Sequence, residues 1–167
     1  IADAETLAPR LAAGYRLQAY AFDKYKTAAA KKEKGAEEEA KISKLVFVLE
    51  AAAKAEKAYH GLGLAVDGTL YARDLVNEPP NVLYPDAFAR RVKADLSPLG
   101  VEVEIFDEKK LKSMGLTAML TVGQGSGFPP RLVVLRWRGA KESAAKKKKS
   151  PGPLAFVGKG LTFDSGG

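Results

Sequence analysis

The sequence predicts an α/β protein in which one domain ends and a second begins. Apolar residues at helical spacing alternate with short apolar runs typical of strands, and one long helical pattern separates two groups of such segments. We therefore expect residues 1–50 to be the C-terminal part of an N-terminal α/β domain and residues 51–78 to be a connecting helix. Residues 79–167 should begin a second α/β domain with a mixed sheet.

The first group contains one helix and one strand. Residues 24–41 are rich in Lys, Glu and Ala, which is typical of a solvated connection. Residues 45–49 form a continuous apolar run, as expected for a strand buried on both faces. The helix comes before both and should end near Asp23, because the following residues recur at helical spacing: Leu7, Leu11, Tyr15, Ala19 and Phe22.

The connecting helix is predicted to run to about residue 76. The stretch from residue 51 contains no proline, and Ala and Leu are frequent. The helix must end before Pro79, because proline disfavours helical geometry in the residue that precedes it. His60 lies in this helix and is the only histidine in the chain. We therefore expect it to be a surface or packing residue and not a metal ligand.

The second domain should open with an amphipathic helix. Pro85 suits the first turn of a helix, and Phe88, Val92 and Leu96 then repeat every four residues. This helix should end before Pro98.

Shorter elements follow along the second domain. Residues 101–105 alternate between apolar and charged side chains, which predicts a strand, and a short helix over 108–114 should close at Gly115. Because strands and helices alternate, we expect a sheet that is at least partly parallel. Three further apolar segments have strand character: residues 118–122, 132–135 and 154–157.

Composition limits the class of protein. With 46% hydrophobic and 28% charged residues, the 167-residue chain can form one ordinary core or parts of two domains. No apolar run approaches the roughly 20 residues that span a bilayer, and the first residues are not those of a signal peptide. The chain has no cysteine, which leaves a reducing compartment as the default. We expect a cytoplasmic protein without a membrane partner, and a chain that is cut at both ends.

The formal net charge of +7 raises nucleic-acid binding as an alternative function. Four of the positive charges lie in one lysine run, at residues 146–149. No aromatic residues that could stack on bases are interleaved with them. A solvated loop is therefore the favoured interpretation of this run, and a nucleic-acid partner is the lesser alternative.

The candidate chemistry lies in residues 154–167, where an apolar strand leads into a turn that carries Lys159 and Asp164 between glycines. Ligand sites in α/β sheets lie at the carboxyl ends of strands, which is where these two residues would fall. A plain turn with Lys159 in solvent is the alternative. A phosphate-binding loop is excluded because Gly160 follows Lys159 where Ser or Thr is required. A nucleophile elbow at Ser165 is excluded because Phe163 replaces its first glycine.

Residues 157–167 read V-G-K-G-L-T-F-D-S-G-G, which resembles the signature around the metal centre of the leucine aminopeptidases (cytosol aminopeptidases). Further segments resemble the same family in the same order, at residues 19–27, 72–81, 122–126 and 129–132. Together they cover most of the chain from residue 19 onward. Residues 79–167 would then begin a metallopeptidase catalytic domain.

The resemblance implies an enzyme that releases N-terminal amino acids, leucine and similar residues, from peptide substrates with two divalent metal ions per subunit. Lys159 would bind one ion and Asp164 would bridge both, in a site that takes manganese or zinc, with magnesium as a further option. A carboxylate can span two ions with its two oxygens. A lysine amine binds a metal only after losing its proton, which a nearby dication favours.

The resemblance also sets limits on this chain. The family's other metal-binding carboxylates and its catalytic lysine and arginine come after Gly167, so the 167 residues contain none of its catalytic residues. We therefore expect these residues alone to lack peptidase activity, because two ligands do not hold a two-metal centre. Members of the family assemble as homo-hexamers. A non-catalytic nucleic-acid-binding or interaction protein on the same scaffold is the alternative.

Overall fold

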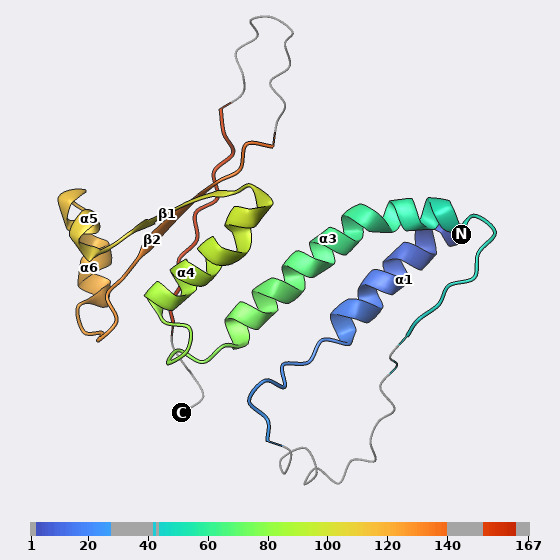
Figure 1. Cartoon of the computed structure of the whole chain (residues 1–167), viewed down its shortest axis with the longest axis horizontal. Helices are drawn as coiled ribbons and strands as arrows, with labels where there is room; N and C mark the ends of the chain where they lie inside the picture. Colours follow the sequence, from blue (N-terminus) through green and yellow to red (C-terminus); the bar gives the residue numbers. More distant parts are fainter. Residues whose placement is uncertain (1–2, 28–41, 43, 140–151, 163–167) are drawn as a thin grey trace, which may run out of the picture. The chain divides into compact units, whose positions relative to one another are not determined.

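The computed structural model describes residues 3–27, 42, 44–139 and 152–162. The chain forms two compact units, Ile1–Asn77 and Glu78–Gly167 (Figure 1). The first unit is helical in its described part, and the second combines helices with a small sheet. The α/β class predicted from the sequence is confirmed. No helix among the described residues is both long and apolar enough to cross a membrane.

In the first unit, helices α1 (Ala4–Gln18) and α3 (Ala52–Asn77) pack side by side (Figure 1). Asp3 caps α1, because its carboxylate accepts a hydrogen bond of 2.9 Å from the backbone N–H of Thr6. The two helices run parallel, since Lys54 reaches Glu5 near their beginnings and later residues also pair in order. Their contact consists of small and medium-sized apolar residues, which allow close approach: Ala8, Pro9, Ala13, Ala55, Gly63 and Val66.

Two predictions for this unit need correction. Helix α1 ends at Gln18 and not near Asp23, because Arg73 binds the carbonyl of Leu17 at 2.6 Å and so satisfies one of the last carbonyls of the helix. The strand expected over residues 45–49 is wrong for the described structure. No described strand pairs with that run, and the Val48 side chain is 92% exposed. The helix predicted from residue 51 to about residue 76 is confirmed as α3, which ends before Pro79 and belongs to the first unit.

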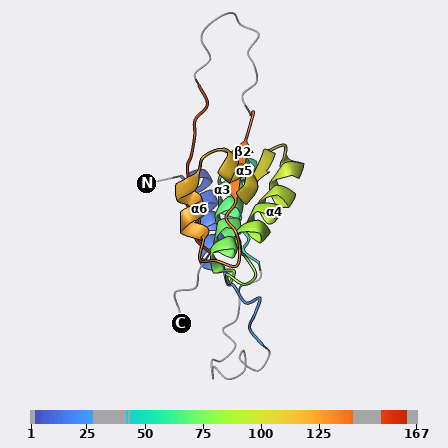
Figure 2. The same cartoon turned by 90° about the vertical axis from the view of Figure 1, so that its left-hand side faces the viewer.

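The second unit opens with α4 (Pro85–Leu96) and the short 3-10 helix η1 (Ser97–Leu99), followed by strand β1 (Glu102–Phe106). Helices α5 (Glu108–Ser113) and α6 (Thr117–Gly123) come next, and strand β2 (Leu132–Arg136) follows. The predicted helix from Pro85, the strand near 101–105 and the short helix before Gly115 are all confirmed. Figure 2 shows α4 and α6 on opposite sides of the two strands.

Strands β1 and β2 pair antiparallel, with a register that runs from Glu102 opposite Arg136 to Phe106 opposite Leu132. Arg136 also forms an ion pair with Glu104, and Arg138 forms one with Glu102 at 3.4 Å. Helix α4 covers the sheet through Ala89 and Val92, which are buried. Leu111 of α5 is fully buried and fixes that helix to the unit.

The strand predicted over residues 132–135 is confirmed as β2, whereas two other strand predictions for this unit fail in the described structure. Residues 118–122 belong to α6. Leu116 and Leu120 are four residues apart, which places them on one face of a helix, and both are half-buried. Residues 154–157 form no strand and their large side chains are exposed, with Val157 at 98%. The two described strands are antiparallel, so the expected parallel pairing is not seen in this part of the chain.

Candidate functional site

Lys159 lies in the segment of residues 152–162, which has no helix or strand and whose residues are all exposed. Within the described residues, its amine forms no hydrogen bond or ion pair. Asp164 falls outside the described residues, so its position relative to Lys159 stays a prediction.

A metal centre needs several ligands close together. Among the described residues, no group of three or more His, Cys, Asp and Glu side chains could hold an ion. His60 is exposed on α3, and it too belongs to no such group. The described residues therefore supply one member of the predicted ligand set, Lys159. A catalytic zinc ion usually takes three protein ligands and a water, so the remaining groups have to come from elsewhere.

The family-like segments 19–27 and 72–81 meet in the first unit. The Tyr20 hydroxyl donates to Asp74 at 2.8 Å and accepts from the Asn77 amide at 3.1 Å. The Arg73 guanidinium lies 5.5 Å from the centre of the Tyr20 ring. We call these four residues the Tyr20 cluster. It joins the ends of α1 and α3 and so has a structural role.

Burial raises the pKa of the Tyr20 hydroxyl above its usual value. A raised pKa means that the folded state favours the neutral hydroxyl. The stability that the neutral Tyr20 hydroxyl contributes is present below about pH 10 and is lost as the pH rises through the raised pKa. We predict that, above pH 10, the amide hydrogen-exchange rate near the end of α3 rises in the wild type by more than base catalysis of exchange alone explains. Tyr20→Phe should lose this additional increase in rate, whereas the control Tyr25→Phe should keep it. An unchanged increase in Tyr20→Phe would count against the role of the cluster.

The segment directly after α3 is fastened to α4 within the second unit. The Glu78 side chain is only 2% exposed and pairs with Arg91 at 3.3 Å. The carbonyl of Pro79 accepts hydrogen bonds from the backbone N–H groups of Val82 and Leu83, both at 2.9 Å. A buried carboxylate is costly unless it is paired, so Arg91 is required for this arrangement.

The family-like segment 129–132 is held by Arg131. Its Nε donates to Asp86 at 2.9 Å, and its Nη1 donates to the carbonyls of Pro129 and Pro130 at 3.3 and 3.0 Å. The Arg131 guanidinium therefore holds the pKa of the Asp86 carboxyl below its usual value. Because Asp86 lies in the first turn of α4, Arg131 ties the start of β2 to that helix.

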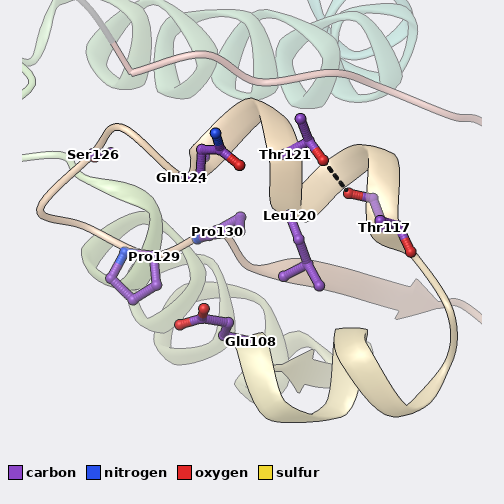
Figure 3. Close-up of a pocket in the computed structure, with 9 residues that line it drawn as sticks. Glu108, Thr117, Leu120, Thr121, Gln124, Ser126, Pro129 and Pro130 are labelled. Carbon is purple, nitrogen blue, oxygen red and sulfur yellow. Dashed lines mark hydrogen bonds between the residues drawn. The ribbon is translucent and has the colours of Figure 1, made fainter.

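The family-like segment 122–126 borders a pocket of about 410 Å³ between α5, α6 and the loop that leads to β2 (Figure 3). Gly115, with φ of 71°, makes the turn between α5 and α6. Gly123 lets Pro130 approach the end of α6, since a Cβ at residue 123 would lie 2.8 Å from the proline Cδ. We call this space the α6 pocket. The sequence analysis did not predict this pocket.

The structure thus assigns most of the family-like segments to the framework and leaves residues 157–167 as the candidate for chemistry. The profile of the cytosol aminopeptidase family's catalytic domain matches residues 70–167, more than half of the chain. The chain belongs to the cytosol aminopeptidase family. This confirms the resemblance drawn from the signature.

Similar proteins carry the same family name. A probable cytosol aminopeptidase of Bradyrhizobium sp. is 49% identical over 161 residues, which are 96% of this chain and 30% of that protein. A probable cytosol aminopeptidase of Methylorubrum extorquens is 46% identical over 154 residues, covering 92% of this chain and 28% of the relative. The chain therefore spans about 30% of the length of these curated cytosol aminopeptidases.

Solved structures have the same fold over the corresponding part. The bottromycin maturation enzyme BotP in complex with Mn is 29% identical with a TM-score of 0.63, covering 80% of this chain and 26% of BotP. A second BotP structure gives 28% identity and a TM-score of 0.62 over the same shares. The manganese is a property of BotP.

Sequence reasoning missed the side chains that hold the framework together. The Tyr20 cluster, the Glu78–Arg91 pair and the Asp86–Arg131 pair were not predicted. One signal was present, since Arg73, Asp74, Glu78 and Arg131 are charged residues within or beside family-like segments. The side-chain partners of Asp74, Glu78 and Arg131 lie 54, 13 and 45 residues away in the chain, which no local pattern reveals.

Proposed function

We propose that the complete gene product is a metal-dependent aminopeptidase that releases N-terminal amino acids, such as leucine, from peptides. The observation that carries the proposal is the metal-centre signature at residues 157–167, inside a catalytic-domain match over residues 70–167. Relatives named as probable cytosol aminopeptidases support the activity and a cytoplasmic location.

In this proposal Lys159 and Asp164 would help to hold two divalent ions, Lys159 as a ligand of one ion and Asp164 as a carboxylate shared by both. When bound, such ions polarise the scissile carbonyl and activate a water molecule as the nucleophile. The similarity to BotP, whose structure was solved in complex with Mn, supports manganese as one candidate, and zinc or magnesium are the others. The exposed position of Lys159 leaves its amine accessible to the groups that would complete the centre.

The homo-hexamer implied by the resemblance is part of this proposal for the complete gene product. Nucleic-acid binding gains no support from the described residues. The lysine run at residues 146–149 falls outside them, and the nearby Arg136 and Arg138 are paired with Glu104 and Glu102. Because each arginine already pairs with a carboxylate, a nucleic-acid phosphate would have to displace that carboxylate in order to bind.

The test is hydrolysis of a chromogenic leucine amide by the complete gene product, before and after metal removal. We expect activity to be highest on the mildly alkaline side of neutrality, because the substrate's amine must lose its proton and free α-amines titrate near about 7.7–8.0. Protons also compete with metals for carboxylate and amine ligands, so activity should fall in acid. A maximum near pH 5 with metals still bound, or full activity after metal removal, would contradict the proposal.

A further inference from the structure

We propose that the α6 pocket binds the side chain of a lysine or arginine residue on a peptide or partner protein. The pocket has an apolar wall and one acidic side chain, Glu108, which match the two parts of a basic side chain. Leu120, Pro129 and Pro130 are half-buried and form the wall. Figure 3 shows Glu108 beside the same space, at the start of α5.

The Glu108 carboxylate is available for a ligand. It forms no hydrogen bond or ion pair with the described residues. It thereby differs from the other described carboxylates of the second unit, which pair with arginine or cap a helix: Glu78, Asp86, Asp95, Glu102, Glu104 and Asp107.

Two other polar side chains of the pocket can accept hydrogen bonds from a ligand. The Thr121 hydroxyl donates to the carbonyl of Thr117 at 3.0 Å, so its oxygen is left as an acceptor. The Gln124 amide has no hydrogen bond within the described structure and offers an acceptor and donors. Glu108 is the only charged side chain among the described residues that line the pocket, and its carboxylate suits an ammonium or guanidinium head. A methylene stem would lie along the leucine and proline wall, as the stems of basic side chains commonly do on apolar surfaces.

Two features limit the strength of this contact. Glu108 is exposed, so water screens its charge, and Lys112 lies one helical turn further along α5 and competes for it. The pocket should therefore recognise a basic residue as one contact within a larger interaction. Removing Lys112 should strengthen binding, because it removes the competing cation.

Saturation-transfer difference NMR on the complete gene product can test this with N-acetyl-L-arginine amide and N-acetyl-L-lysine amide. Their blocked amines exclude them as aminopeptidase substrates, so the test is independent of the proposed function. We expect signal from the side-chain methylenes and a weaker signal from uncharged N-acetyl-L-norleucine amide. Glu108→Gln should lower the affinity about two- to fivefold, as for loss of an exposed ion pair. Lys112→Met should raise it.

Glu102→Gln is the matched control, because Glu102 of β1 pairs with Arg138 and does not line the pocket. It should leave both probes unaffected. The proposal is overturned if the norleucine probe binds as well as the basic probes, or if Glu108→Gln leaves the affinity unchanged. It is also overturned if the basic probes give no signal at a concentration of about 10 mM, at which even weak binding is measurable. Both variants change exposed side chains, so loss of folding does not obscure the result.

Discussion

Lys159→Ala and Asp164→Ala are each expected to lower kcat/KM for a leucine amide by at least about a thousandfold in the complete gene product. That factor corresponds to about 4 kcal/mol of transition-state stabilisation, the scale of removing the charge of a bound metal ion. Asp164→Ala should have the larger effect, because a bridging carboxylate serves two ions whereas an amine serves one.

The control for these variants is Lys147→Ala. Lys147 belongs to the lysine run at residues 146–149, outside the signature, and its loss should change activity little. Steady-state assays at saturating metal compare the three variants with the wild type. Normal turnover by Asp164→Ala would remove this residue from the proposed centre. A loss in Lys147→Ala equal to that in Lys159→Ala would show that the activity depends on net charge and not on the signature.

Glu78→Ala is expected to give the largest local loss of stability among the framework variants. The Glu78 side chain is 2% exposed, and removing it leaves Arg91 with fewer partners at the start of the second unit. Arg91 is itself 34% exposed and keeps a contact with Asp95 at 3.8 Å, so water and this carboxylate offset part of the loss. We expect a cost of about 1–3 kcal/mol, as for a broken buried hydrogen bond to a charged group.

Hydrogen exchange followed by mass spectrometry of peptides from α4 measures this effect. A cost of that size accelerates exchange of the protected amides by about 5- to 150-fold when they exchange through local opening. Glu102→Ala is the control, since its ion pair with Arg138 is exposed and should contribute less than about 1 kcal/mol. Equal exchange rates in Glu78→Ala and the wild type would show that the pair does not hold α4.

Local patterns predicted the elements whose stability is local. The helices α3 and α4 and the strand β1 follow from spacing and from proline positions that a reader can find in the sequence. Residues 118–122 were misassigned because a five-residue apolar run suits a strand or a short helix equally, and the contact between α5 and α6 decides between them. The spacing of apolar residues in the sequence does not reveal such a contact between helices.

The runs at residues 45–49 and 154–157 show a second limit. Both have the composition of buried strands, and neither pairs with a strand in the described structure. A strand is stabilised by hydrogen bonds to a neighbour that is distant in sequence, so composition alone does not determine whether it forms.

The candidate site was predicted from the signature and not from geometry. Lys159 and Asp164 could be selected because a long, specific pattern surrounds them, while their three-dimensional relation is still a prediction. The α6 pocket illustrates the opposite case. Glu108 and Gln124 carry no recognisable motif together, and only the turn at Gly115 and the close approach of Gly123 to Pro130 bring the pocket residues to one place.

The metal content of the purified complete gene product tests the central claim most directly. Elemental analysis by mass spectrometry, after removal of loosely bound ions, should find two divalent ions per subunit in the wild type and in Lys147→Ala. Asp164→Ala should lose both ions, because both would share this carboxylate in the proposed centre, and Lys159→Ala should lose at least one. If Lys159→Ala and Asp164→Ala both retain two ions per subunit, residues 157–167 do not form the metal centre and the account is wrong.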